Sequence, residues 1–223
     1  MRAPTFSAVL FDLDGTLADS AEDIIAALAL AFADVGVEPA QPLHLLVDGS
    51  PLEVLFAVAA PGAPEAQYAA FAARYRAHYD HLGHARTRLY PGVRETLEAL
   101  ALLRPRPWLA VATAKRSETA RSVCAHLGVE SFFAAIEGTG GTRVPPKPAP
   151  DLLLRLQAQA GVPAERCLLV GDTLRDVRAG QAAGMRTAAA TWGLGRREDL
   201  ARAGADHVLE DMEDLLPLFV ARG

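Results

Sequence analysis

The sequence predicts an α/β fold built on a parallel sheet, with an all-helical domain inserted after the first strand. From residue 90 onward, short apolar runs alternate with helical patterns, which is typical of parallel strands joined by crossover helices. Between residues 18 and 86 the pattern is helical and no strand is indicated. We therefore expect a core domain made of residues 1–17 and 87–223, and a helical domain made of residues 18–86.

The first predicted strand ends in two acidic residues. An apolar run at residues 8–11 is followed by Asp12 and Asp14, and Gly15 then turns the chain. In extended backbone, side chains at i and i+2 leave on the same side, so the two carboxylates face one small volume. Two carboxylates this close repel each other and need a cation or a shared proton. The spacing alone also fits an ordinary turn with two solvated aspartates.

The inserted segment predicts three helices. The sequence Ser20-Ala21-Glu22-Asp23 resembles a capping box in front of the first helix, which ends near Gly36. A turn at residues 48–51 precedes the second helix, and the third runs from about Glu65 to His81. The apolar face of the third helix is expected to pack against its neighbours rather than to bind a ligand; it comprises Tyr68, Phe71, Tyr75 and Tyr79.

The remaining elements follow in alternation. A helix at 93–103 precedes a strand at 108–112 that ends at Thr113, and a helix at 117–126 precedes an apolar run at 132–136. A proline-rich loop contains Lys147 and leads into a helix at 151–160. A strand at 167–170 ends at Gly171-Asp172, and a helix at 176–183 is followed by weaker strands at 187–191 and 207–209.

Composition excludes several classes of function. The net charge is −5, so the chain has no basic footprint for nucleic acid. The longest apolar stretch, residues 24–33, is half of the roughly 20 residues that a membrane span needs, and the N-terminus lacks the apolar region of a signal peptide. The two cysteines lie in apolar patterns, which suits a reducing compartment. We expect a cytoplasmic protein without a membrane or nucleic-acid partner.

Polar side chains gather where the predicted strands end. In an open parallel sheet, ligands bind outside the carboxyl ends of the strands. Carboxylates there suit Mg²⁺, while a hydroxyl and an ammonium suit phosphate oxygens, a combination that fits phosphoryl transfer. Each residue alone has an ordinary structural explanation, such as a helix N-terminal acid, but their joint occurrence favours a catalytic site. The set comprises Asp12, Asp14, Thr113, Lys147, Asp172 and Asp176.

Four motifs extend this set into a family pattern. They are Asp12-Leu13-Asp14-Gly15-Thr16-Leu17, Ala112-Thr113-Ala114-Lys115, Lys147-Pro148-Ala149-Pro150 and Gly171-Asp172-Thr173-Leu174-Arg175-Asp176. In their order and spacing the chain resembles the haloacid dehalogenase superfamily, specifically phosphatases with a helical C1-type cap. Within these it is most similar to the phosphoglycolate-phosphatase-like proteins. The resemblance implies a Rossmann-like core, a helical cap domain at 18–86, a small phosphorylated metabolite as substrate and Mg²⁺ as cofactor.

The resemblance also implies catalytic roles. Asp12 is expected to attack phosphorus and become an aspartyl phosphate, which divides one displacement into two. Asp14 is expected to protonate the leaving oxygen and then to deprotonate the attacking water. Thr113 is expected to donate a hydrogen bond to a phosphate oxygen, and Lys147 to offset charge on Asp12 and the phosphoryl group.

The metal ligands follow from the same resemblance. Mg²⁺ is expected to be held by Asp12, by the backbone carbonyl of Asp14 and by Asp172. Asp176 is expected to bind the ion through water or to orient Lys147. The alternative of a non-catalytic protein that keeps the fold is disfavoured, because every catalytic position carries the residue that the family uses.

The cap is expected to select the substrate. Gly49 and Ser50 lie in the predicted loop at residues 47–51 and are candidates for substrate contact, with an ordinary interhelix turn as the alternative. The hinges of the cap are expected at residues 17–18 and 84–88. Lys115 and Lys147 are the only two lysines beside 20 arginines. Lys115 is expected to be structural, because the family often has Thr-Asn-Lys where this chain has Thr113-Ala114-Lys115.

Related activities can be weighed against the sequence. Haloacid dehalogenases lack the second aspartate, which is present here as Asp14, so a phosphate substrate is favoured over a halide. Phosphonoacetaldehyde hydrolases need a cap lysine, and residues 1–114 contain none. β-Phosphoglucomutases carry an arginine shortly after the cap glycine to hold a second phosphate. Here Gly49 is followed by Ser-Pro-Leu-Glu, so a mutase activity is disfavoured. Phosphoglycolate, small sugar phosphates, nucleotides and pyrophosphate remain as candidate substrates, and a monomer or a homodimer as the oligomeric state.

Overall fold

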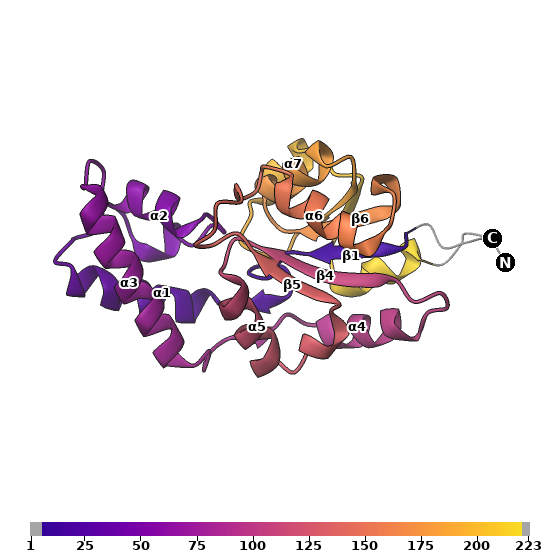
Figure 1. The fold of residues 1–223 in the computed structure, drawn as a ribbon, viewed down its shortest axis with the longest axis horizontal. Coiled ribbons are helices and arrows are strands. Elements are labelled where there is room, and N and C mark those ends of the chain that lie inside the picture. The colour runs from indigo at the N-terminus through magenta and orange to yellow at the C-terminus, as the bar shows by residue number, and fades with distance from the viewer. Residues whose placement is uncertain (1–5, 220–223) are drawn as a thin grey trace.

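The computed structural model describes residues 6–219 and contains a six-stranded parallel sheet (Figure 1). The strand order is β5-β4-β1-β6-β7-β8. The strands are β1 (Ala8–Phe11), β4 (Trp108–Thr113), β5 (Ala135–Gly138), β6 (Cys167–Gly171), β7 (Arg186–Ala190) and β8 (His207–Leu209). The α/β class predicted from the alternation of strands and helices is confirmed.

The first strand lies in the centre of the sheet and separates two layers of helices. It pairs with β4 on one side and with β6 on the other. Because side chains alternate along a strand, Ala8 and Leu10 pack against one layer, and Val9 and Phe11 against the other. The first layer contains α6 (Asp151–Ala160) and α7 (Leu174–Ala182), and the second contains α4 (Val93–Leu102) and α5 (Ser117–His126). Burial of both faces explains why the central strands are continuously apolar.

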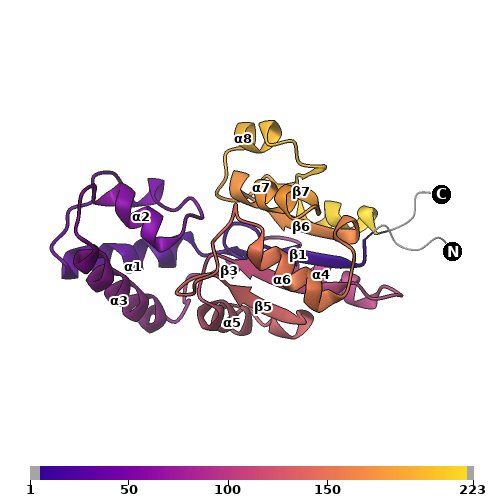
Figure 2. The ribbon, with the colours of Figure 1, turned by 45° about the horizontal axis from the view of Figure 1, so that its top comes forward.

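The inserted helices lie to one side of the sheet, at the left of both views (Figures 1 and 2). They are α1 (Ala21–Asp34), α2 (Leu52–Ala59) and α3 (Glu65–Leu82), with a 3₁₀ turn at Leu43–Leu45. The rings of Phe32 and Phe56 lie 4.4 Å and 4.7 Å from the ring of Phe71, centroid to centroid. Residues that closely follow β1, β4 and β5 line a cavity together with residues of α2 and α3, so these helices face the carboxyl ends of the strands. The division into domains at residues 18 and 86 remains a prediction.

Two short strands connect the helical segment to the sheet, and the first of them corrects the expectation that residues 18–86 contain no strand. β2 (Ala18–Asp19) pairs antiparallel with β3 (Arg88–Leu89). Asp23 reinforces the junction, since its Oδ2 accepts hydrogen bonds from Arg86 N at 3.0 Å and from Thr87 Oγ1 at 2.7 Å. The two connecting segments run side by side, so each satisfies backbone groups of the other.

The predicted capping box at residues 20–23 is wrong. Ser20 occupies the N-cap position of α1 but makes no side-chain cap hydrogen bond. Its hydroxyl instead donates to Asp14, which the fold brings close to it. Capping boxes do form further along the chain, for example where Thr173 and Asp176 bond reciprocally at the start of α7. Ser20 is thus oriented toward Asp14 rather than toward the backbone amides of α1.

Smaller differences concern element boundaries. β5 lies at Ala135–Gly138 rather than at the apolar run 132–136, and α7 begins at Leu174 rather than at Asp176. The helix α8 (Arg197–Arg202) and the 3₁₀ helices at Glu130–Phe132, Ala164–Arg166 and Met212–Leu218 are not predicted from the sequence. Among residues 6–219, none of the helices has the length and apolar character needed to cross a membrane.

Candidate active site

Three buried carboxylates meet at the carboxyl end of the central strands. Carboxylate oxygens of Asp12, Asp172 and Asp176 all lie within 4.8 Å of one another. Asp12 follows β1, and its backbone N–H donates to Val170 O of β6 at 2.9 Å, which fixes it beside the strand that leads to Asp172. The exposed fraction of these residues is 7% for Asp12, 0% for Asp172 and 1% for Asp176. The topology thus collects an oxygen-rich cluster that is nearly closed to water.

Lys147 is the cation within this cluster. Its ammonium lies 3.0 Å from Asp12 Oδ1 and 2.5 Å from Asp176 Oδ1, and it donates to Ala112 O at 2.9 Å. The carbonyl of Ala112 belongs to β4, so the ammonium is held between the ends of neighbouring strands. Burial opposes the charge on Lys147, but Asp12 and Asp176 outweigh burial and raise its pKa. The lysine therefore stays protonated.

Asp172 is held rigidly by its neighbours. Its Oδ1 accepts a hydrogen bond from Thr16 Oγ1 at 2.8 Å, and its Oδ2 accepts one from Leu194 N at 2.7 Å. Gly15 leaves room for it: a Cβ at position 15 would lie 2.1 Å from Asp172 Oδ2, and the φ of +86° also favours glycine. The glycine that follows Asp14 in the sequence is thus required by a carboxylate from a distant segment.

Burial, together with the excess of carboxylates in the cluster, raises two pKa values. Burial raises the pKa of Asp12 to about 7, against the lowering effect of Lys147 and with further increases from Asp176 and Asp14. Burial likewise raises the pKa of Asp172 to about 8, with Asp176 and Asp12 adding to it. One ammonium is not enough to neutralise three buried carboxylates, so the cluster favours an additional cation or bound protons.

Asp14 lies in a separate environment. Its Oδ2 is 2.9 Å from the ammonium of Lys115, and its Oδ1 accepts from the Ser20 hydroxyl. The Lys115 ammonium also lies over the ring of Tyr79, 4.6 Å from its centroid. The expectation that Lys115 is structural stays a prediction, and in this fold its ammonium holds one carboxylate oxygen of Asp14.

Thr113 ends β4 and is almost fully buried, with 1% of the residue exposed. Its hydroxyl oxygen accepts a hydrogen bond from the backbone N–H of Lys115 at 3.2 Å. This leaves the hydroxyl hydrogen available to a ligand, since no hydrogen bond donated by this hydroxyl is formed within residues 6–219.

The loop at residues 47–51 reaches the core next to the cluster. Arg175, in the first turn of α7, donates to Asp48 O and lies 3.5 Å from Asp48 Oδ1. A Cβ at Gly49 would lie 3.2 Å from Thr173 Cγ2, so the loop and the core touch closely at this point. Asp48 Oδ1 also accepts from Ser50 N at 2.8 Å, which shapes the loop as a tight turn.

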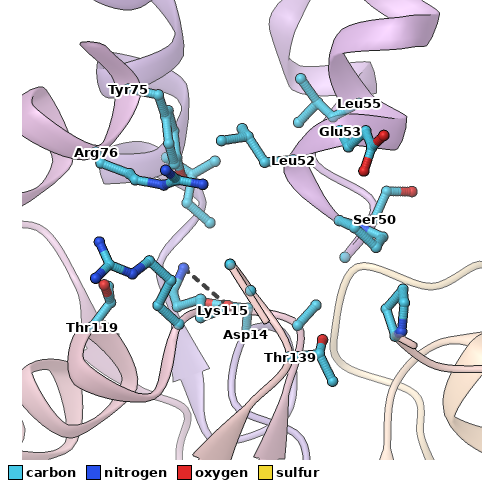
Figure 3. A pocket seen from close by; sticks show the side chains of 18 of the residues that line it. Asp14, Ser50, Leu52, Glu53, Leu55, Tyr75, Arg76, Lys115, Thr119 and Thr139 are labelled. Carbon is cyan, nitrogen blue, oxygen red and sulfur yellow. Dashed lines mark ion pairs between the residues drawn. The ribbon is translucent and has the colours of Figure 1, made fainter. Parts of the chain in front are cut away.

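A cavity of about 230 Å³ opens between the inserted helices and the core (Figure 3). Asp14 and Lys115 line it from the core side, and Ser50 lines it from the 47–51 loop. Gly49 also lines it, so both cap residues predicted as substrate contacts border this space. We call it the Asp14 cavity. The geometry therefore places a small-molecule pocket directly beside one of the two paired aspartates.

Residues 9–190 match the family model described as haloacid dehalogenase-like hydrolase. The chain belongs to this family. It is 35% identical to phosphoglycolate phosphatase 1 of Pseudomonas aeruginosa over an alignment that covers 94% of this chain and 78% of that protein. It is 33% identical to the phosphoglycolate phosphatase of Aquifex aeolicus, with 91% and 98% covered. The crystal structure of a predicted phosphoglycolate phosphatase from Haemophilus somnus superposes with a TM-score of 0.83 at 27% identity, covering 96% of this chain and 98% of that one.

The comparisons confirm the resemblance stated from the motifs. This haloacid dehalogenase-like hydrolase is an enzyme of the phosphatase type, and its acidic cluster fits a divalent metal ion. The structure brings the predicted cluster residues Asp12, Asp172 and Asp176 together, with Lys147 among them. Thr113 ends the neighbouring strand β4, while the side chain of Asp14 turns to Lys115.

Some site residues of this hydrolase were not predicted. The sequence pattern predicts a capping role for Ser20, and it indicates no role for Arg175, which lies inside a family motif. Tyr75 and Tyr79 stack with their rings 5.8 Å apart, as predicted for helix packing, but both also line the Asp14 cavity. The scarcity of lysine was the one sequence signal that pointed to Lys115.

Proposed function

We propose that this hydrolase removes the phosphoryl group from a small phosphorylated metabolite, with Asp12 as the nucleophile and Mg²⁺ as the cofactor. The observation that carries the proposal is the buried cluster of Asp12, Asp172 and Asp176 around the ammonium of Lys147. Phosphoryl transfer depends chiefly on positioning and charge stabilisation, which such a cluster supplies.

The residues present fit Mg²⁺. Three carboxylates offer oxygens within 4.8 Å of one another, and hard oxygen ligands are what this ion prefers. Burial and the neighbouring carboxylates raise the pKa values of Asp12 and Asp172, so a further cation beside Lys147 would stabilise their ionised forms. Asp12, Asp172 and the backbone carbonyl of Asp14 would hold the ion, with Asp176 binding through water or orienting Lys147. When bound, Mg²⁺ supplies a positive charge that stabilises the phosphoryl oxygens.

The first step is a displacement at phosphorus. A carboxylate oxygen of Asp12 forms a bond to phosphorus while the bond from phosphorus to the leaving oxygen breaks. Asp14 donates a proton to that oxygen, so the product leaves as an alcohol. Lys147 offsets negative charge on Asp12 and the phosphoryl group, and Thr113 donates its hydroxyl hydrogen to a phosphate oxygen. The result is an aspartyl phosphate on Asp12.

The second step regenerates the enzyme. Asp14, now a carboxylate, takes a proton from a water molecule, and the water oxygen bonds to phosphorus. The bond between phosphorus and Asp12 breaks, and inorganic phosphate leaves. In its ionised form Asp14 is held by the hydrogen bond from Ser20 and by the ion pair with Lys115. In this scheme Gly49 and Ser50 contact the substrate from the loop, and closure of the helical segment limits access of other water.

The proposed substrate is 2-phosphoglycolate. The names of two curated relatives support it, and the small Asp14 cavity suits a leaving group of few atoms. Small sugar phosphates, nucleotides and pyrophosphate are the competing candidates. A panel of these compounds, ranked by kcat/KM with Mg²⁺ present, decides among them: a value for 2-phosphoglycolate below those of the sugar phosphates would contradict the assignment.

The catalytic proposal is tested with p-nitrophenyl phosphate. Wild type is expected to release p-nitrophenol with Mg²⁺, and to lose this activity in excess EDTA. Asp12→Asn should lower kcat by at least about 10³-fold, because an amide does not attack phosphorus. Asp19→Asn, which changes an exposed aspartate on β2, is the control and should keep wild-type activity. Absence of turnover by wild type, or normal turnover by Asp12→Asn, contradicts the proposal.

A further inference from the structure

The Asp14 cavity contains a cation without a partner. Arg76, on α3, lines the cavity and is half-buried. It makes no hydrogen bond or ion pair with any residue in the described range 6–219. Figure 3 shows its side chain extending from α3 into the cavity, with the guanidinium on the side of Lys115 and Asp14. A guanidinium aimed into a partly closed space is a ready binding site for an anion.

The other cations of the cavity are already engaged. Lys115 is paired with Asp14 at 2.9 Å, and Arg116 lies 3.6 Å from Glu118. Arg76 is therefore the lining cation whose charge remains free for a ligand.

A second polar group in the cavity lacks an acceptor for its hydrogen. Tyr79 lies on α3 close to Arg76 in sequence, and only 3% of the residue is exposed. The Lys115 ammonium, a donor, lies next to its hydroxyl, and no group within the described chain accepts the hydroxyl hydrogen. Burial raises the pKa of Tyr79, so the hydroxyl is a protonated donor at neutral pH. A buried donor without an acceptor is unfavourable, and a ligand oxygen in the cavity would satisfy it.

The size and charge of the cavity define the ligand. Its volume of about 230 Å³ lies below the usual range of about 300–1,000 Å³ for drug-sized ligands, so the occupant is small. Two exposed carboxylates, Glu53 and Asp80, line the cavity as well, and with Asp14 they balance the three lining cations. An even balance favours a ligand group with a single negative charge over a second phosphate. The planar guanidinium of Arg76 matches a carboxylate in geometry.

We propose that Arg76 is a specificity-determining residue that binds the carboxylate of a small phosphorylated acid, with the Tyr79 hydroxyl as a second donor. This proposal rests on the proposed function, since it places the phosphoryl group at Asp12 and the leaving group in the Asp14 cavity. The helical segment thus selects substrates whose leaving group carries a negative charge, and Arg76 supplies the discrimination. The interaction adds to the binding of such substrates and leaves the displacement at phosphorus unchanged.

The test compares two substrates that differ in charge. One is 2-phosphoglycolate, and the other is 2-hydroxyethyl phosphate, in which a hydroxymethyl group replaces the carboxylate. Wild type is expected to prefer 2-phosphoglycolate by kcat/KM. Arg76→Met should lower kcat/KM for 2-phosphoglycolate by about 10- to 100-fold, the usual effect of losing a charged hydrogen bond, and change it less than about threefold for 2-hydroxyethyl phosphate. Arg76→Lys should restore part of the preference.

Arg74→Met is the matched control. Arg74 lies on the same helix, has 65% of its side chain exposed and lies 3.8 Å from Asp34, and it does not line the Asp14 cavity. It should leave both substrates unaffected. A charge-reversing variant gives a second readout: Arg76→Glu should raise kcat/KM for O-phosphoethanolamine, which carries an ammonium, relative to 2-phosphoglycolate. Circular dichroism melting curves show whether each variant is folded.

The outcomes separate the two proposals. If wild type with Mg²⁺ hydrolyses neither these two esters nor p-nitrophenyl phosphate, the proposed function fails. If it hydrolyses only p-nitrophenyl phosphate, the proposed function stands and the role of Arg76 is refuted. If wild type hydrolyses both and Arg76→Met lowers both to the same extent, the proposed function stands and the role of Arg76 in specificity is refuted. An unchanged preference in Arg76→Met, or no gain for O-phosphoethanolamine in a folded Arg76→Glu protein, refutes it as well.

Discussion

Replacing Asp12 with asparagine should stabilise the metal-free protein while abolishing catalysis. Burial is the main reason that the pKa of Asp12 rises from 3.8 to about 7, and Asp176 and Asp14 add to it against the effect of Lys147. The folded state therefore disfavours the ionised carboxylate. An amide of nearly the same shape avoids this cost, because it carries no charge.

The magnitude follows from linkage. A rise from 3.8 to about 7 is about three pKa units, which at 1.36 kcal/mol per unit corresponds to ~4 kcal/mol at pH 8. Asparagine pairs less strongly with the Lys147 ammonium, so we expect a net gain of about 2–4 kcal/mol in the free energy of unfolding. Because the folded state binds the extra proton, the cost in wild type grows as pH rises from about 4 to about 7 and is complete above pH 7. The gain in the free energy of unfolding of Asp12→Asn at pH 5 should therefore be less than half of the gain at pH 8.

The assay is urea unfolding followed by circular dichroism, with EDTA present, at pH 8 and pH 5. Asp19→Asn should change the free energy of unfolding by less than about 0.5 kcal/mol at both pH values, since Asp19 is exposed. Adding Mg²⁺ at pH 8 should stabilise wild type more than Asp12→Asn and so narrow the difference between them. An Asp12→Asn protein that is no more stable than wild type at pH 8 in EDTA would refute the reasoning.

Three further predictions concern the same region. Burial raises the pKa of Asp12 to about 7 and of Asp172 to about 8, so Mg²⁺ must displace protons to bind below these values. The Kd for Mg²⁺, measured by calorimetry, should therefore rise about tenfold or more per pH unit below pH 7. Equal Kd values at pH 6 and pH 8 would contradict this prediction. Gly15→Ala would put a Cβ 2.1 Å from Asp172 Oδ2 and so displace this carboxylate. The Kd for Mg²⁺, measured by calorimetry, should rise at least about tenfold. An unchanged Kd would contradict the prediction by showing that the site adapts to the added methyl group. Arg175→Ala removes the contact with Asp48, so protease cleavage in the loop 47–51 should accelerate several-fold. The affinity for Mg²⁺ should stay the same. An unaltered cleavage rate would mean that the contact does not hold the loop.

The acidic cluster could be predicted because it depends on topology. Asp12 and Asp172 directly follow apolar runs, and parallel strands that share a direction bring such positions to one edge of the sheet. Their meeting required only that β1 and β6 be neighbours in the sheet. The same logic located Thr113 at the end of β4.

The surroundings of Asp14 could not be predicted in this way. Its partners Ser20 and Lys115 come from the start of α1 and from the loop after β4, and local patterns favoured a cap for the first and a structural role for the second. A side-chain hydrogen bond outside regular structure depends on where each loop passes, and periodicity carries no information about that path. The short strands β2 and β3 escaped prediction for the same reason, because two-residue strands leave no alternation to detect.

The sequence by itself determined the fold class, the order of the elements and the identity of the chemical groups, because these follow from apolar periodicity and from residue types at strand ends. Only the tertiary structure decided how those groups are used. It placed a single ammonium among three carboxylates, paired Asp14 with Lys115, and set Arg76 in the cavity without a hydrogen-bond or ion-pair partner among residues 6–219. The first arrangement arises where loops of the core meet, and the environment of Asp14 and Arg76 arises where the inserted helices meet the core. In both places the distances are fixed by packing between segments far apart in the chain.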